Sequence, residues 1–215
     1  MGKTQVLERI KSIGVIPVVR AASEDEALRA VEAIRAGGLT ILEITMTVPG
    51  AVRIIERITG EYGDEVLVGA GTVLDPEQAD HCIRAGAQFV VSPALNFETI
   101  KYCREADCAV MPGALTPTEV VQAWSAGADM VKIFPCGAVG GASYIKSLKA
   151  PLPQIELVPT GGVSLDTAAS FIKAGAAAIG VGADLVDLKA IREGNAEKVT
   201  ETARIYMETV RKARA

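Results

Sequence analysis

Two charged residues stand inside otherwise apolar segments, and their types could do chemistry together. Lys132 lies in the apolar run 130–134, and Glu43 lies in the run 41–45. Burial removes the water that stabilises an ammonium ion, and the neutral amine is a nucleophile toward carbonyl carbons. A carboxyl group within reach of that amine could move protons as a general acid or base. The pair therefore indicates Schiff-base chemistry on a carbonyl substrate.

A structural ion pair is the alternative interpretation of Lys132 and Glu43. Their positions in the sequence leave the two interpretations almost equally favoured. Burying two charges costs several kcal/mol in lost hydration, which their mutual attraction does not always recover. Because stability alone is a weak reason to bury such a pair, the functional interpretation is modestly favoured.

Two glycine-rich segments indicate a site for a phosphate group. Thr160, Gly161 and Gly162 stand at the end of one apolar run, and Gly180 and Gly182 stand at the end of the next one. Glycine-rich turns that lead into helices leave backbone N–H groups free to bind an anion. Glycines also occur in tight turns for steric reasons alone. Two such segments at the ends of consecutive apolar runs nevertheless indicate a phosphate site more specifically than one segment does.

The elements that must position these residues alternate along the chain. Short apolar runs, expected to be strands, cover residues 15–19, 41–45, 66–70, 89–92, 109–111, 130–134, 156–160 and 177–181. Segments with helical periodicity cover residues 4–13, 24–36, 52–58, 76–85, 97–106, 117–125, 143–149, 165–174 and 197–211. Continuous apolar strands are typical of a parallel sheet that is covered on both faces.

Eight strands that alternate with helices predict an α/β fold, a (β/α)8 TIM barrel with a short N-terminal helix. We expect a single domain over residues 1–215, because no linker divides the chain. The recurring Ala-Gly pairs at 36–37, 85–86, 126–127 and 174–175 fit helix ends that turn into the next strand. A doubly wound open sheet is the competing architecture. In a barrel, the functional groups are expected at the carboxyl ends of the strands.

Composition excludes several classes of protein. Hydrophobic residues make up 49% of the chain, which excludes a disordered protein, and the net charge of −4 with no block of like charges argues against a nucleic-acid or anionic-membrane surface. No apolar stretch approaches the roughly 20 residues that span a bilayer, and no signal-peptide core is present near the start. The one histidine and four scattered cysteines predict no zinc site and reduced thiols in a cytoplasmic protein.

The segments at the expected strand ends resemble a known family. They are Leu-Glu-Ile-Thr at 42–45, Gly-Ala-Gly-Thr-Val at 69–73, Val-Ser-Pro at 91–93, Met-Pro-Gly at 111–113, Lys-Ile-Phe-Pro at 132–135 and Pro-Thr-Gly-Gly-Val at 159–163. In this order they resemble the 2-keto-3-deoxy-6-phosphogluconate (KDPG) / 4-hydroxy-2-oxoglutarate (KHG) aldolases over nearly the whole chain. The resemblance implies a metal-independent class I aldolase without a cofactor, which forms pyruvate and glyceraldehyde 3-phosphate from KDPG. It also implies a homotrimer.

The resemblance also implies roles for individual residues. Lys132 forms the Schiff base with the substrate C2 carbonyl, and Glu43 acts as the general acid and base through a water molecule. The substrate-binding residues implied are Gly71 and Thr72 for the pyruvate carboxylate, Pro93 and Phe134 for the apolar wall, and Thr160, Gly161, Gly162 and Gly182 for the distal phosphate.

Two positions depart from the family pattern and put the identity of the substrate in doubt. Many members carry an arginine four residues after the catalytic glutamate, where this chain has Thr47. We hypothesise that Arg20, after the first strand, supplies the missing charge for a substrate anion, so that Arg20→Ala should weaken the binding of pyruvate. Members often carry a serine where this chain has Ala183, so one hydroxyl contact to the phosphate is lost.

Three alternatives remain open on the sequence. The substrate could be the 6-phosphogalactonate analogue or 4-hydroxy-2-oxoglutarate. The chain could be a phosphate-binding barrel isomerase or epimerase, which needs paired acid and base groups or a metal rather than Lys132. It could also be a non-catalytic barrel that binds sugar phosphates, although Lys132 and Glu43 argue against this.

Overall fold

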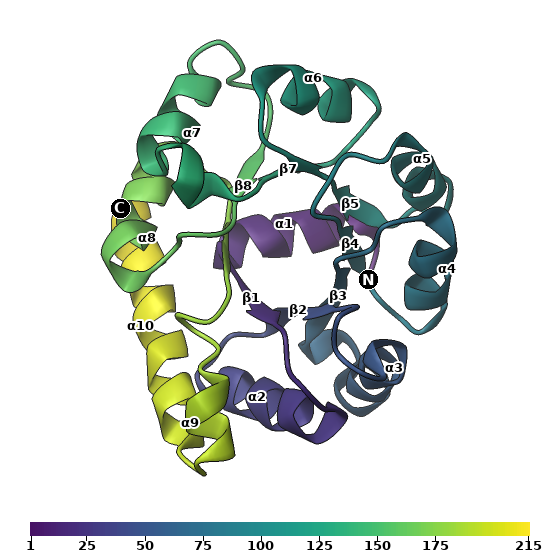
Figure 1. The fold of residues 1–215 in the computed structure, drawn as a ribbon, viewed down its shortest axis with the longest axis vertical. Coiled ribbons are helices and arrows are strands. Elements are labelled where there is room, and N and C mark those ends of the chain that lie inside the picture. The colour runs from purple at the N-terminus through teal and green to yellow at the C-terminus, as the bar shows by residue number, and fades with distance from the viewer.

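The computed structural model describes residues 1–215 as parallel strands with helices on the outside (Figure 1). The strands are β1 (Val15–Val19), β2 (Ile41–Thr45), β3 (Leu67–Gly71), β4 (Phe89–Val91), β5 (Ala109–Met111), β6 (Gly113–Ala114), β7 (Val131–Ile133), β8 (Leu157–Pro159) and β9 (Ile179–Val181). The helices are α1 (Lys3–Ile13), α2 (Glu24–Ala36), α3 (Ala51–Tyr62), α4 (Pro76–Arg84), α5 (Phe97–Glu105), α6 (Pro117–Ser125), α7 (Ala142–Lys149), α8 (Leu165–Lys173), α9 (Leu188–Arg192) and α10 (Ala196–Arg214). Short 3₁₀ turns cover Gly63–Glu65 and Cys136–Val139.

The strands form two parallel sheets. Six strands follow the order β5-β4-β3-β2-β1-β9, and three follow the order β6-β7-β8. The expected α/β class with parallel strands is confirmed. Each strand predicted from the sequence is present to within two residues at either end.

The strand predicted at residues 109–111 is followed, after one proline, by a second short strand. Pro112 lies between β5 and β6 and has no backbone N–H, so it cannot donate to a ladder. Its carbonyl oxygen still accepts the backbone N–H of Lys132 at 2.9 Å. At the other edge of the three-stranded sheet, a single β-bridge joins Thr160, which follows β8, to Gly180, which lies within β9. The helix α9 was not predicted from the sequence, because its five residues are too few to show helical periodicity.

Helix α1 covers one end of the strands. Figure 1 shows it behind the middle of the ring of strands. Its residues Val6 and Ile10 are buried in an apolar cluster with residues from the starts of β1, β2 and β3, namely Ile16, Ile41 and Leu67. The amino ends of the strands are thereby sealed with apolar side chains. Polar groups that serve a ligand must lie toward the carboxyl ends.

The other helices pack against the outward-facing side of the strands. They enclose a larger apolar cluster that includes Ile34, Ile54, Phe171 and Tyr206, all at most 1% exposed. No helix combines the length and the apolar character needed to cross a membrane.

Candidate active site

Strands β2 and β7 bring Glu43 and Lys132 together. The Lys132 Nζ atom lies 3.9 Å from the Glu43 Oε1 atom, and each side chain is 3% exposed. This separation exceeds a normal hydrogen bond. The Glu43 Oε1 atom is buried and accepts no hydrogen bond from the rest of the chain. A buried carboxylate oxygen without a partner is costly for stability, and it is free to exchange a proton with a reacting group.

Gly71 provides the space that the Glu43 carboxylate occupies. It ends β3, where it pairs with Thr45 of the neighbouring strand β2. A Cβ atom at position 71 would lie only 1.9 Å from the Glu43 Oε1 atom. Only glycine leaves room for the carboxylate in this orientation.

We therefore expect Gly71→Ala to displace the Glu43 carboxylate and lower kcat by about 10- to 100-fold, because misplaced acid–base groups lose much of their effect. Steady-state kinetics would measure the loss. Gly60→Ala is the matched control, because a Cβ atom there meets nothing within 4 Å. A Gly71→Ala enzyme with wild-type kcat would show that the position of this carboxylate is unimportant.

Thr72 has an unusual backbone conformation directly after Gly71. Its φ of 60° lies in the left-handed region, which β-branched residues rarely adopt. Such strain costs about 1–3 kcal/mol and is concentrated at functional sites. The sequence-based prediction placed the substrate carboxylate at Thr72, and this conformation is consistent with a constrained binding residue.

Phe134 flanks Lys132, and the backbone of Pro93 lies beside Gly113, next to the strand that carries Lys132. A Cβ atom on Gly113 would lie 2.3 Å from the Pro93 carbonyl group, and Gly113 is the ladder partner of Lys132. The Lys132 Nζ atom lies 5.3 Å from the centre of the Phe134 ring. The ring face therefore covers one side of the amine.

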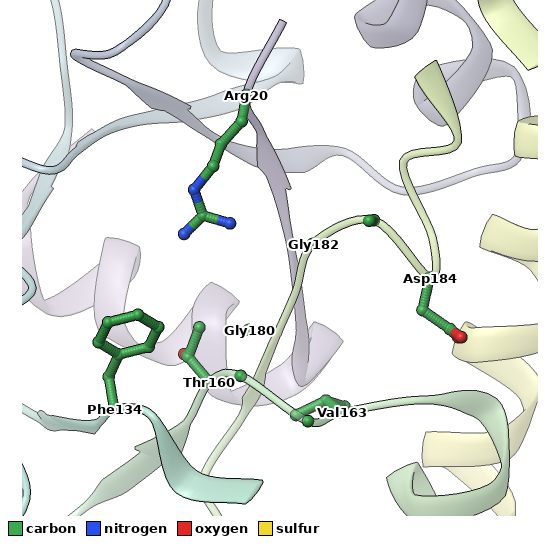
Figure 2. A pocket seen from close by; sticks show the side chains of 10 residues that line it. Arg20, Phe134, Thr160, Val163, Gly180, Gly182 and Asp184 are labelled. Atoms are coloured by element: carbon green, nitrogen blue, oxygen red, sulfur yellow. The ribbon is translucent and has the colours of Figure 1, made fainter. Parts of the chain in front are cut away.

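A cavity of about 260 Å³ opens beside Phe134 (Figure 2). It is lined by Arg20, Phe134, Thr160, Gly161, Gly162, Val163, Gly180, Gly182, Ala183 and Asp184. The loops after β8 and β9 provide most of this lining. The structure thus brings together eight of the residues singled out in the sequence, that is, all of the lining except Val163 and Asp184. Because Phe134 also covers Lys132, the cavity lies next to the buried amine.

The loops after β8 and β9 present free hydrogen-bond donors. The backbone N–H groups of residues 161–163 and 182–184 donate no hydrogen bond within the chain. The carbonyl oxygen of Gly182 accepts the N–H groups of Leu185 at 3.1 Å and Val186 at 2.9 Å. Unpaired N–H groups on two adjoining glycine loops form a site for an anion.

Close backbone approach explains the glycines of the first loop. Gly161 and Gly162 have φ values of 81° and 79°. A Cβ atom on Gly162 would also lie 2.7 Å from the Cα atom of Gly137. A larger residue at position 162 would therefore push the loop away from the turn after β7.

Arg20 lies on the side of the cavity formed by the loop after β9. Figure 2 shows its guanidinium group extending into the cavity from the end of β1. A Cβ atom at Gly182 would lie 3.2 Å from its Nη1 atom. The cavity therefore combines one cation with the free N–H donors.

Thr47 lies beside Thr45 at the end of β2 and offers no positive charge. The Thr45 hydroxyl donates to the carbonyl oxygen of Val19 at 3.0 Å, and the two threonine hydroxyl oxygens are 2.7 Å apart. Because Thr45 has only one hydroxyl hydrogen, Thr47 must donate to Thr45. Thr47 is exposed, and its oxygen retains lone pairs, so this position can accept a hydrogen bond from a ligand.

Asp184 lines the cavity but was not singled out in the sequence. An acidic residue after a glycine loop resembles an ordinary helix cap, so no local signal distinguishes it. The remaining reactive residues lie elsewhere or are inert. Burial raises the pKa of the Cys136 thiol to about 11, and His81 is exposed on α4. No group of three or more histidine, cysteine, aspartate or glutamate side chains is placed to hold a metal ion.

Comparison with known proteins identifies the family of this chain. The family model for KDPG and KHG aldolases matches residues 6–202. The 2-dehydro-3-deoxy-6-phosphogalactonate aldolase of Escherichia coli K12 is 39% identical over 197 residues, which cover 91% of this chain and 96% of the relative. The 2-dehydro-3-deoxy-phosphogluconate aldolase of Treponema pallidum is 33% identical over 205 residues, which cover 95% of this chain and 97% of the relative.

A solved structure is similar at the level of the whole fold. The KDPG aldolase of Legionella pneumophila, with pyruvate captured as a covalent carbinolamine intermediate, has a TM-score of 0.83 and 29% identity, covering 95% of this chain and 97% of the other. The family match spans most of the chain, and the relatives align over nearly their whole lengths. The chain therefore belongs to the KDPG and KHG aldolase family.

Proposed function

We propose that this protein is a class I aldolase, a lyase that cleaves KDPG to pyruvate and glyceraldehyde 3-phosphate. The observation that carries the proposal is the buried pair of Lys132 and Glu43, whose Oε1 atom has no hydrogen-bond partner. The cavity with free N–H donors and Arg20 lies beside this pair. A buried amine, a free carboxylate oxygen and an adjoining anion site are the groups that this reaction needs.

The first half of the reaction forms the imine. The Lys132 amine gives up a proton, its free electron pair attacks the C2 carbonyl carbon to form a C–N bond, and the carbonyl oxygen takes up a proton. Glu43 supplies protons for the loss of this oxygen as water, through a water molecule that bridges it to the substrate. The resulting protonated imine carries a positive charge next to C3.

The second half breaks the carbon–carbon bond. The Glu43 carboxylate takes the proton of the C4 hydroxyl, whose oxygen becomes the aldehyde oxygen as the C3–C4 bond breaks. The electron pair of that bond moves toward the imine nitrogen and leaves an enamine. Protonation of C3 and hydrolysis of the imine release pyruvate and restore Lys132. In this scheme Gly71 and Thr72 hold the carboxylate of the pyruvate half, and Pro93 and Phe134 form the apolar wall.

The distal phosphate is assigned to the cavity between the loops after β8 and β9. Thr160, Gly161 and Gly162 contribute from one side, and Gly182 and Ala183 contribute backbone N–H groups from the other. The sequence led us to expect that Arg20 replaces the usual arginine and affects pyruvate binding. Because its guanidinium group lies beside Gly182 in this cavity, we propose instead that Arg20 binds the phosphate. Thr47 then serves as a hydrogen-bond acceptor for a substrate hydroxyl, in place of the arginine that many relatives have.

Arg20→Ala is expected to raise KM for KDPG about tenfold, because a charge-assisted hydrogen bond to phosphate contributes about 1.5–3 kcal/mol. The concentration of pyruvate that half-saturates imine formation should change little. Kinetics with KDPG and trapping with pyruvate measure the two effects separately. An Arg20→Ala enzyme that binds pyruvate tenfold more weakly and KDPG normally would assign Arg20 to the carboxylate instead.

The experiment that tests the proposed function is reductive trapping. Pyruvate and sodium borohydride should yield one covalent adduct, and peptide mapping should locate it on Lys132. No adduct, or an adduct spread over surface lysines, would contradict the proposal and favour an isomerase, an epimerase or a non-catalytic sugar-phosphate-binding barrel.

The substrate is tested by comparing three compounds. KDPG is the first candidate, and 2-dehydro-3-deoxy-6-phosphogalactonate and 4-hydroxy-2-oxoglutarate are the alternatives. The 39% identical relative bears the name of the galactonate enzyme, which supports testing that epimer with equal care. A coupled assay for pyruvate release would rank the three compounds by kcat/KM.

We also propose that residues 1–215 form a single domain in which the two sheets act as one eight-stranded barrel. Two observations support the barrel: β5 and β6 are separated only by Pro112, and Thr160 bridges to Gly180. Trimming the chain from either end should then abolish cooperative folding rather than release a stable fragment.

Assembly and location complete the proposal. We propose a homotrimer in the cytoplasm, whose partner molecules are phosphorylated keto acids rather than nucleic acids or membranes. Leu74 and Phe97 are both 51% exposed. The Asn96 side chain, next to Phe97, donates to the Leu74 carbonyl oxygen at 3.1 Å and so brings the two apolar residues to one region of the surface. These exposed apolar side chains support a contact between subunits there. The four buried, unpaired cysteines are consistent with a reducing compartment. Sedimentation analysis tests the trimer.

A further inference from the structure

Asp184 joins the two loops that carry the free N–H donors. It belongs to the loop after β9, and its Oδ1 atom accepts the backbone N–H of Leu165 at 3.1 Å. Leu165 is the first residue of α8 and follows the loop after β8. One carboxylate oxygen therefore spans the two sides of the cavity.

The same oxygen is tied to the outer layer of the molecule. The Tyr206 hydroxyl of α10 donates to the Asp184 Oδ1 atom. Tyr206 is fully buried, and burial together with this carboxylate raises the pKa of the Tyr206 hydroxyl, so it stays a proton donor. Figure 2 shows the Asp184 side chain turned away from Arg20. Its Oδ1 atom thus binds groups of the protein, and the side chain is directed away from the cation of the cavity.

No other side-chain hydrogen bond joins these two loops. The Ser164 and Thr167 side chains bond within the loop after β8 and the start of α8. The Asp187 carboxylate accepts the N–H of Ala190 at 3.0 Å and pairs with Lys198 at 2.7 Å, so it holds α9 and α10. The backbone bridge between Thr160 and Gly180 joins the bases of the two loops, and Asp184 adds the side-chain link near α8, so the relative position of the two rows of donors depends on both.

We propose that Asp184, held by Tyr206, is a positioning residue that sets the spacing between the two loops of the phosphate site. The inference rests on the proposed function. Loss of the carboxylate oxygen lets the loops move apart, and residues 161–163 and 182–184 then no longer reach one phosphate group together. The effect is confined to the distal end of the substrate, because Lys132 and Glu43 belong to other strands.

The test separates the acceptor oxygen of Asp184 from its charge. Asp184→Asn keeps an oxygen that can accept both hydrogen bonds, and we expect its KM for KDPG to stay within about twofold of wild type or to fall. Asp184→Ala removes the acceptor, and we expect KM to rise about tenfold while trapping of pyruvate on Lys132 is unchanged. If repulsion of the phosphate by the charge were the only effect of Asp184, both variants would lower KM, and the proposal would be wrong.

Tyr206→Phe is a second, milder variant in case Asp184→Ala does not fold. It removes one of the two hydrogen bonds and retains the buried ring, and we expect KM to rise about threefold with kcat preserved. An unchanged KM in this variant would overturn the role of Tyr206 as the group that holds Asp184.

Asp75→Ala is the control for a general loss of stability, because Asp75 caps α4 by accepting the N–H of Gln78 at 2.8 Å, away from both loops. A rise in KM for the control equal to that of Asp184→Ala would also contradict the proposal.

A binding measurement keeps this inference distinct from the proposed reaction. Inorganic phosphate should shift the amide NMR signals of Gly161, Gly162, Gly182 and Ala183 in the wild-type protein, and it should bind Asp184→Ala about tenfold more weakly. Phosphate binding of equal strength in both proteins would overturn the inference even if the aldolase is active. If trapping with pyruvate fails while the phosphate result holds, the proposed reaction is wrong and the positioning role stands.

Discussion

Lys132→Arg is expected to abolish turnover, with kcat lowered by at least about 1000-fold, because a guanidinium group stays protonated and cannot form the imine. The variant retains a positive charge next to Glu43, whose Oε1 atom lies 3.9 Å from the Lys132 Nζ atom. The effect on turnover is therefore separated from the loss of the ion pair. Pyruvate and borohydride should leave no adduct on the variant, as measured by intact mass.

The matched control is Lys146→Arg, an exposed lysine on α7. It should show wild-type kcat and wild-type trapping. Lys132→Ala adds a stability measurement, because it leaves Glu43 as an unpaired buried carboxylate at a cost of about 3–5 kcal/mol. Thermal unfolding should show this cost. Turnover by folded Lys132→Arg equal to wild type would instead favour a non-catalytic or isomerase role for the barrel.

Glu43→Gln is expected to lower kcat by about 100- to 10 000-fold, because the amide cannot exchange the protons of the carbinolamine and of the C4 hydroxyl. The side chain keeps its size, so the space opposite Gly71 stays filled. Imine formation with pyruvate should become slow but still reach Lys132, since the nucleophile is intact. The time course of borohydride trapping separates this slow step from a loss of binding.

Glu119→Gln provides the control for changing a carboxylate to an amide. The Glu119 carboxylate accepts the backbone N–H groups of Leu115 at 2.9 Å and Thr116 at 2.8 Å at the start of α6, and these bonds lower its pKa. The substitution should reduce stability and leave kcat unchanged. Glu43→Gln with kcat within twofold of wild type would show that another group transfers the protons.

The sequence by itself determined the layout of the elements and the identity of the reactive pair. Apolar runs such as 15–19 and 41–45 became β1 and β2 with the expected bounds, because a strand covered on both faces must be apolar throughout. Lys132 and Glu43 were conspicuous for the same reason, since a charge inside such a run is costly. Gly161 and Gly162 were predicted to belong to a phosphate loop from their type and position, and this role stays a prediction.

The tertiary structure decided how distant segments meet. The contact between Gly71 and the Glu43 carboxylate depends on the register of β2 against β3, which local patterns do not encode. The break at Pro112 and the helix α9 were too short or too local to show in periodicity. For residues 47 and 184, too, the sequence shows the residue type and only the structure shows its partners. Thr47 could be identified as a departure from a pattern, but its proposed role as an acceptor rests on its contact with Thr45, which only the structure shows.

Asp184 illustrates the physical reason most clearly. Its partners Leu165 and Tyr206 are 19 and 22 residues away in the sequence, on two different helices. A single aspartate after a glycine loop has many possible partners, and its type is equally suited to a helix cap or to solvent. The packing of α8 and α10 beside the cavity selects one arrangement. Local sequence therefore specifies which groups are available, and the packing of distant elements specifies which of them act together.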